Sequence, residues 1–163
     1  MMKYVILSVA WVLLTPFPSL AQKSALSAEE QAIKEVIENE TRYFWARDYK
    51  KWKKCWAHEP WIVWTVATRD GVKQYRGWEA WSSAVKELFE EDPEPKPYDV
   101  VKSNYMFHLF GNGAWVTFDQ VAGGNESEEV RVLEKINGRW RILMVEAVYN
   151  ANESAEGMTT SQQ

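Results

Sequence analysis

The chain has 163 residues, a formal net charge of -4, and a hydrophobic fraction of 46% that includes 10 tryptophans. This length suits one domain, and the acidic balance argues against nucleic acid or an anionic membrane as a partner. The single cysteine, Cys55, excludes an internal disulfide. We therefore expect a hydrophobic core to hold the fold, with Cys55 as one of its small apolar residues.

The first 21 residues have the features of an export signal. Lys3 supplies a positive start, residues 4–14 form an apolar run, and Ser19 and Ala21 are the small residues before a cleavage site. A retained anchor is the alternative, but a membrane span needs about 20 apolar residues, more than this run contains. We expect a signal peptide at 1–21, an exported periplasmic or secreted domain at 22–149 with no stable membrane anchor, and a disordered tail at 150–163.

Three helices are expected ahead of most of the strands. Residues 27–47 carry apolar side chains at three- and four-residue spacing, and Ser27 with Glu30 forms a capping box. Asp48 is expected to cap a short second helix that ends before Pro60, and a third helix is expected to follow Gly77.

Alternating and β-branched segments predict the sheet. Residues 61–66 and 72–75 read as a hairpin, and a meander follows over residues 98–110, 114–121, 127–136 and 139–149. The Asn137-Gly138 pair between the last two segments is a strong hairpin signal. The order of elements predicts an α+β fold in which three helices pack on one face of a curved antiparallel sheet.

Several segments, in this order, resemble the nuclear transport factor 2-like (SnoaL-like) superfamily. The matching segments are ARD before the second helix, YRGWEAW at the third, FGNGAWVTF, and VRVLEKINGRWRI in the final hairpin. The resemblance covers residues 29–148 and implies a cone-shaped fold with a pocket at its wide end. It says little about chemistry, because one fold can carry many functions.

Strand parity then predicts which side chains enter that pocket. The resemblance places Trp140 in the core, so Ile142, Met144, Glu146 and Val148 are expected to share its inward face. Arg141, Leu143, Val145, Ala147 and Tyr149 would then face outward. With Trp115, these apolar side chains would form an outer surface suited to a homodimer.

Two acids are the candidate catalytic residues, Glu146 on the last strand and Glu40 on the first helix. A carboxyl group in an apolar pocket has a raised pKa, which suits general acid–base work. The alternative is that each Glu is solvated at the rim or pairs with a cation such as Arg42 or Arg47. The whole predicted pocket comprises Glu40, Phe44, Trp64, Trp81, Val132, Met144 and Glu146.

Known catalytic patterns of the superfamily are missing. Its steroid-isomerase branch uses a Tyr and two Asp residues at positions that correspond by spacing to Glu40, Trp64 and Val132. The Asp–His pair of its polyketide-cyclase branch has no counterpart on the predicted inward face. Trp64 would give the cavity a flat aromatic wall or simply fill it.

No cofactor and no metal are expected. The sequence contains no nucleotide-binding glycine motif, and the two histidines, His58 and His108, are not expected to converge on a metal. The leading hypothesis is an exported domain that binds a small apolar or planar ligand. The alternatives are a cofactor-free isomerase, dehydratase or cyclase that uses a pocket Glu, and an assembly domain with a plugged pocket.

Overall fold

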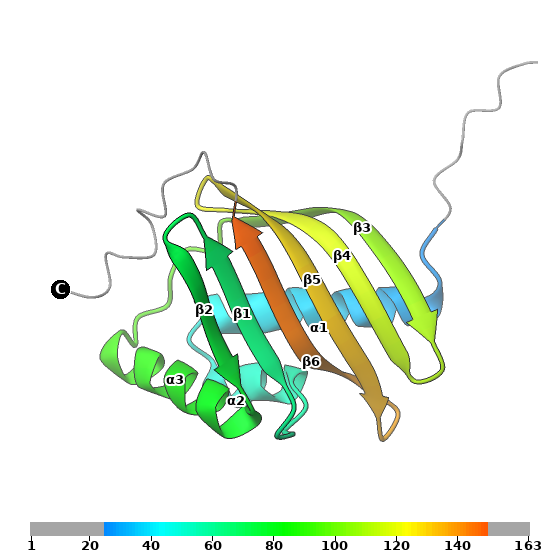
Figure 1. Ribbon diagram of the computed structural model, residues 1–163, viewed down its shortest axis with the longest axis horizontal. Coiled ribbons are helices and arrows are strands. Elements are labelled where there is room, and N and C mark those ends of the chain that lie inside the picture. Colours follow the sequence, from blue (N-terminus) through cyan, green and yellow to red (C-terminus); the bar gives the residue numbers. More distant parts are fainter. Residues whose placement is uncertain (1–24, 150–163) are drawn as a thin grey trace, which may run out of the picture.

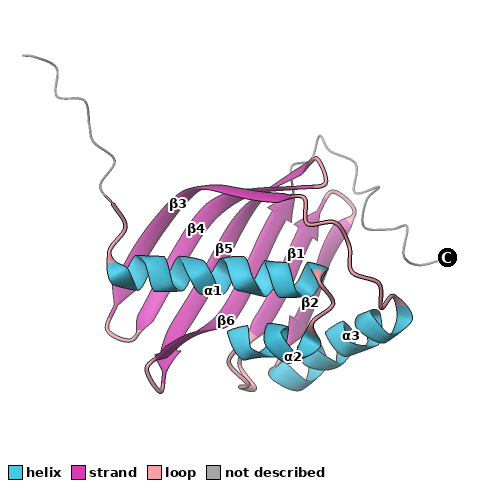
Figure 2. Cartoon of the chain, turned by 180° about the vertical axis from the view of Figure 1, so that it is seen from behind, coloured by secondary structure: helices cyan, strands magenta, loops and turns pink. Residues whose placement is uncertain are grey.

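The computed structural model describes residues 25–149, which form a six-stranded sheet with helices on one of its faces. Figure 1 shows the sheet with α1 passing behind it, and Figure 2 shows from the other side that all three α-helices lie on the same face. We call the face that the helices cover the inner face and the opposite one the outer face. The predicted signal peptide at 1–21 and the predicted tail at 150–163 lie outside the described residues.

The helices begin where the capping residues predict. Helix α1 (Ala28–Trp45) has the capping box: the Ser27 backbone N–H donates to Glu30 Oε2 at 2.7 Å, and the Glu30 N–H donates to Ser27 Oγ at 3.3 Å. Helix α2 (Tyr49–Trp52) starts at Asp48, whose carboxylate accepts from the Lys51 N–H. A 3₁₀ turn η1 (Lys53–Cys55) continues it, and α3 spans Trp78–Glu91.

The strands match the predicted segments, but the sheet is mixed rather than antiparallel. They are β1 (Val63–Thr68), β2 (Gly71–Arg76), β3 (Val100–Phe110), β4 (Gly113–Ala122), β5 (Asn125–Ile136) and β6 (Arg139–Tyr149). Their order is β2-β1-β6-β5-β4-β3, and β1 pairs with β6 in parallel. After β2 the chain runs through α3 and the meander, and β6 then lies beside β1 and runs in the same direction. This parallel pairing joins strands far apart in the chain, so the patterns of single strands could not predict it.

The β5–β6 hairpin forms at Asn137 and Gly138 as predicted. Asn137 has a φ of 51° and Gly138 a φ of 75°. These positive values match the twist of the flanking strands, so Ile136 pairs directly with Arg139.

The core lies between the inner face and the helices. Its fully buried large side chains include Trp52, Trp56, Ile33, Ile37, Ile62, Leu133 and Ile142. Cys55 is buried as expected, and burial raises the pKa of its thiol to about 12, so it stays protonated and unreactive. Within residues 25–149, no helix is long and apolar enough to cross a membrane.

Candidate functional site

Glu146 and Met144 lie on the outer face, which corrects the prediction from strand parity. The pairing of β5 with β6 shifts between Val132 and Leu133, because Val132 pairs with Met144 and Leu133 pairs with Ile142. Leu143 is thus an extra residue in β6. A bulge of this kind reverses the alternation beyond it, so a face predicted from Trp140 is right only as far as Ile142.

The reversal exchanges the predicted inner and outer residues on the second half of β6. Val145 and Ala147 were expected outside but are buried, with exposed fractions of 4% and 7%, whereas Val148 is 43% exposed. Val132 pairs with Met144 and with Trp115, which is 51% exposed, so Val132 also belongs to the outer face. None of Val132, Met144 and Glu146 can line a pocket beneath the helices.

The aromatic residues of the predicted pocket are packed against one another. The ring of Trp64 stacks on that of Trp81 with centroids 4.5 Å apart, and Phe44 meets Phe89 edge-on at 5.3 Å. The cluster continues through Trp52, Trp56, Tyr75 and Trp78. Trp64 therefore fills this end of the molecule, which was the alternative to an aromatic pocket wall.

Glu40 points inward as predicted, but it is bound by a core tryptophan. Its carboxylate is buried, and its Oε1 accepts a hydrogen bond of 2.9 Å from the indole Nε1 of Trp52. The cation Arg47 instead pairs with Asp92 at 2.8 Å. Glu40 thus satisfies a buried donor of the core, as a structural residue would.

A second polar group on the inner face was not predicted. The side chains of Lys102, Gln120 and Ser127 lie in one row across β3, β4 and β5, because Lys102 pairs with Gln120 and Gln120 with Ser127. Glu129 and Arg131 follow Ser127 on the same face of β5. We call these five residues, with Glu38 of α1, the inner polar cluster.

Glu129 accepts hydrogen bonds from three other residues of this cluster. Its Oε1 accepts from Gln120 Nε2 at 3.0 Å and from Ser127 Oγ at 2.7 Å, and its Oε2 accepts from Arg131 Nη1 at 2.7 Å. Glu129 is 2% exposed and Arg131 is 4% exposed. A buried ion pair held by two further hydrogen bonds fixes both side chains in place.

The amine of Lys102 is also shielded from solvent, but no hydrogen bond from the described residues holds it. Its side chain is 0% exposed, and the nearest carboxylate oxygen, Glu38 Oε2, is 3.9 Å from Nζ, beyond hydrogen-bonding distance. The pKa of Lys102 is lowered to about 8, mainly by burial and also by Arg131, although the acids Glu38, Glu40 and Glu129 act to raise it.

Glu38 is already engaged by other donors. It accepts from the hydroxyl of Tyr105 at 2.8 Å and from the Lys34 ammonium at 2.9 Å. Although burial raises the pKa of Glu38, these hydrogen bonds outweigh it and leave the pKa below its ordinary value. Glu38 is therefore an ionised carboxylate at neutral pH, while burial and Glu38 together raise the pKa of Tyr105.

Three buried polar atoms of the cluster have no hydrogen-bond partner within the described chain: Lys102 Nζ, Gln120 Oε1 and Arg131 Nε. Native proteins rarely leave such atoms unbonded. The inward position of Gln120, Glu129 and Arg131 could have been predicted from the sequence, because these residues alternate in step with core residues on their strands.

The inward position of Lys102 could not have been predicted, because a register shift between Ser103 and Met106 interrupts the alternation of β3.

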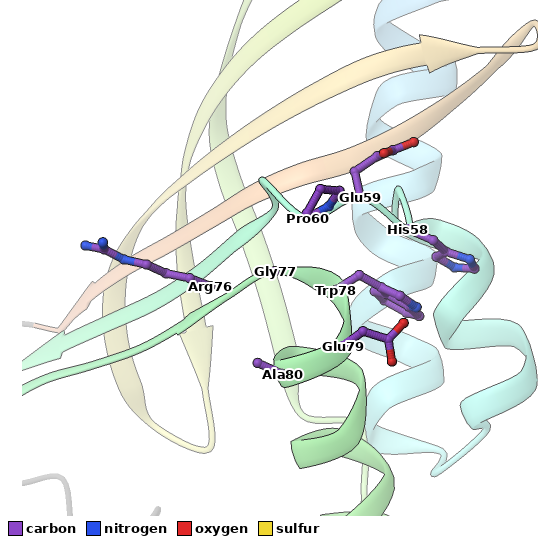
Figure 3. Close-up of a pocket in the computed structure, with 8 residues that line it drawn as sticks. All are labelled: His58, Glu59, Pro60, Arg76, Gly77, Trp78, Glu79 and Ala80. Atoms are coloured by element: carbon purple, nitrogen blue, oxygen red, sulfur yellow. The ribbon is translucent and has the colours of Figure 1, made fainter.

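The groove in Figure 3 lies elsewhere, at the start of α3. It has a volume of about 420 Å³ and is open to solvent; its lining residues are His58, Glu59, Pro60, Arg76, Gly77, Trp78, Glu79 and Ala80. The ring of His58 stacks on that of Trp78 at 4.1 Å, and its Nε2 lies 2.8 Å from the Lys53 carbonyl oxygen. These contacts stabilise the loop before β1. Among residues 25–149, no three metal-binding side chains come together here or elsewhere.

In sequence, the chain matches no protein-family model and no curated protein. In structure, it is similar to a nuclear transport factor 2-like protein of unknown function from Shewanella baltica, with a TM-score of 0.57 and 14% identity over 75% of this chain and 94% of that one. A second such protein, from Silicibacter pomeroyi, has a TM-score of 0.59 and 10% identity, and the match covers 77% of this chain and 100% of that one. A candidate ketosteroid isomerase from Parabacteroides distasonis has a TM-score of 0.57 and 11% identity, and the match covers 72% of this chain and 85% of that one.

Proposed function

We propose, on the premise that this chain has a nuclear transport factor 2-like fold, that it is a small-molecule-binding domain. The ligand would lie against the inner face of the sheet at the inner polar cluster. This site replaces the predicted one around Trp64 and Glu146, since Trp64 packs against Trp81 and Glu146 lies on the outer face.

The observation that carries the proposal is the group of unbonded atoms on Lys102, Gln120 and Arg131. Two are donors and one is an acceptor, all are shielded from solvent, and they come from three adjacent strands. Leaving a buried polar group without a partner costs about 1–3 kcal/mol. A ligand with complementary polar groups would remove that cost, which favours binding at this place.

Aromatic rings beside the cluster support a planar or apolar ligand body. Tyr105 stacks with Phe118 at 4.9 Å and with Phe107 at 5.7 Å. Pockets for small molecules combine such surfaces with a few well-placed polar groups. The expected ligand is therefore flat and apolar at one end and polar at the other.

Native mass spectrometry of the protein purified from its own host would test this proposal. We expect a stoichiometric small molecule that is lost in Lys102→Met and in Gln120→Leu. Glu146→Gln is the control, because the outer-face carboxylate should have no effect on retention. A molecule lost from Glu146→Gln but retained by both other variants would contradict the inner site. An empty wild-type protein would favour the assembly domain with a filled interior.

A cofactor-free isomerase-type enzyme is a second candidate, favoured by Lys102. Its amine, with a pKa near 8, is within reach of general-base work at neutral pH. The earlier candidates are less suited, since Glu146 faces outward and Glu40 is bound by Trp52. Exchange of the α-protons of 2-cyclohexenone in deuterium oxide, followed by NMR, tests this activity. Exchange should disappear in Lys102→Met and persist in Glu146→Gln; equal exchange in both variants would exclude Lys102 as the base.

Export is also proposed, from the sequence of residues 1–21. Signal peptidase would cut after Ala21 because small residues stand one and three positions before the cut. The intact mass of the protein secreted or released from the periplasm should correspond to a chain that starts at Gln22. A mass that includes Met1 would contradict cleavage.

A further inference from the structure

We infer that the ligand of the inner polar cluster carries a carboxylate, which accepts hydrogen bonds from Lys102 Nζ and Arg131 Nε. This inference rests on the proposed function and specifies its ligand class.

The unbonded donors both belong to cationic groups. Arg131 cannot lose its proton in a protein, so its Nε–H always needs an acceptor. Its Nη1 already donates to Glu129 and to the Val130 carbonyl oxygen. Lys102 has three N–H donors when protonated, and none has an acceptor among the described residues. The missing partner is therefore an acceptor, and an anion satisfies cationic donors best.

The resident carboxylates do not fill this role. Glu129 is held by Gln120, Ser127 and Arg131, and Glu38 is held by Tyr105 and Lys34. Glu40 is held by hydrogen bonds from Trp52 and Thr41.

The charge of Lys102 is correspondingly under-compensated. Its pKa stays low although three acids act to raise it, so the protonated amine is poorly stabilised in the ligand-free protein. A carboxylate placed against the amine would supply the missing stabilisation.

The aromatic surface suits an aromatic acid. The Arg131 guanidinium lies over the Phe118 ring at 5.2 Å, so the polar and aromatic parts of the site adjoin each other. A ligand whose carboxylate meets the two cations would place its ring against the partly buried Tyr105, which stacks on the buried Phe118. Benzoate is the simplest molecule of this kind, and benzamide is its neutral counterpart of nearly the same shape.

Binding of such an anion depends on protonated Lys102. The charged groups that act on this amine are Glu38 and Glu40 from α1 and Glu129 and Arg131 from β5. Two tyrosines, Tyr98 and Tyr105, lie near Glu38 in turn. Burial raises the pKa of both tyrosines, so they stay neutral through pH 9. With a pKa of about 8, the protonated fraction of Lys102 falls about fivefold between pH 8 and pH 9, and affinity for a carboxylate should fall with it.

Isothermal titration calorimetry of the mature protein, freed of any retained molecule, tests the inference with benzoate and benzamide. At pH 7 we expect benzoate to bind at least tenfold more tightly than benzamide. The preference should disappear in Lys102→Met and remain in Lys50→Met, which removes an exposed lysine of α2. In the wild-type protein this preference should also weaken by about fivefold between pH 8 and pH 9, as the protonated fraction of Lys102 falls.

The outcomes separate this inference from the proposed function. Three results would overturn the inference that the ligand carries a carboxylate: equal affinity for benzoate and benzamide, a preference for benzoate that does not change with pH, or no binding of either compound. A retained molecule without an acid group would also overturn it, yet would leave the binding domain standing. A protein that is empty when taken from its host would instead contradict the proposed function itself. The pH series on the wild-type protein decides the matter even if Lys102→Met does not fold.

Discussion

Lys102 shows how a single buried charge links stability to function. A lysine whose pKa falls from 10.5 to about 8 on folding destabilises the folded state by about 3 kcal/mol when it is protonated. Proteins keep such residues mainly where their chemistry is used.

The stability of Lys102→Met should therefore depend on pH in a defined way. Below pH 8 both states of the wild-type chain hold the proton, so the penalty is complete and the ligand-free variant should be more stable by up to about 3 kcal/mol. Between pH 8 and about 10.5 the unfolded state binds more protons than the folded state, so wild-type stability rises with pH and the difference narrows. Urea unfolding at pH 7 and pH 10 measures this, with Lys50→Met as control. A difference that is the same at both pH values would contradict the lowered pKa.

Glu40 offers the contrasting case of a buried acid with a structural partner. Glu40→Ala leaves the Trp52 Nε1–H without its acceptor and should lower the free energy of unfolding by about 2 kcal/mol. Glu40→Gln keeps an acceptor oxygen and should cost less than half as much.

Urea unfolding with Glu35→Ala as control would measure both effects, since Glu35 is exposed on the same helix and should change stability by less than about 0.5 kcal/mol. If the Gln and Ala variants of Glu40 were equally unstable, the charge of the carboxylate rather than its hydrogen bond would be what matters.

At the scale of one strand, the bulge at Leu143 decides which half of β6 reaches the core. Val145 and Ala147 are buried because the extra residue reverses the alternation, and Met144 and Glu146 face outward for the same reason. The position of the bulge therefore determines which acid could belong to an inner site.

Deleting Val145 would keep the bulge but shift every later residue of β6 by one position, which turns Glu146 inward and Ala147 outward. Burying an unpaired carboxylate and losing Val145 from the core should cost more than about 4 kcal/mol, so we expect loss of a cooperative unfolding transition. Deleting Leu143 removes only the extra residue and leaves Val145 and Ala147 inward, so that variant should still unfold cooperatively. Circular dichroism during urea unfolding would measure both variants, and equal behaviour of the two deletions would contradict a bulge at Leu143.

For the molecule as a whole, the outer face presents apolar side chains that the chain does not cover. Trp115 is 51% exposed, Phe110 52% and Met106 69%. Two residues expected there, Val145 and Ala147, are buried instead, but Met144 and Val132 take their place beside Trp115. We propose that a second copy of the chain packs on this face, because exposed apolar surfaces of this kind usually mark an interface.

Trp115→Glu should weaken that dimer by about thirtyfold or more, as expected for a tryptophan near the centre of an interface. Sedimentation equilibrium measures the dissociation constant. Trp61→Glu is the control, because Trp61 is 63% exposed but lies before β1 and outside the sheet. A wild-type protein that stays monomeric, or an equal effect of both variants, would contradict an interface at this face.

The sequence alone determined the elements, and it placed the strand ends within two residues of those observed. Caps at Ser27 and Asp48, and the turn at Asn137 and Gly138, act through hydrogen bonds and backbone angles of neighbouring residues, which short segments contain in full. The helix-on-sheet class followed from the order of these elements, and the nuclear transport factor 2-like resemblance agreed with the observed fold.

Only the tertiary structure decided the site. A bulge depends on how two strands pair, so Glu146 could not be assigned to a face from β6 by itself. The parallel pairing of β1 with β6, and the packing of Trp64 on Trp81, likewise join segments far apart in the chain. The inner polar cluster brings Glu38 of α1 together with residues of β3, β4 and β5. Its burial and its unbonded atoms exist only once those elements pack, because desolvation is a property of the folded surroundings and not of the residue type.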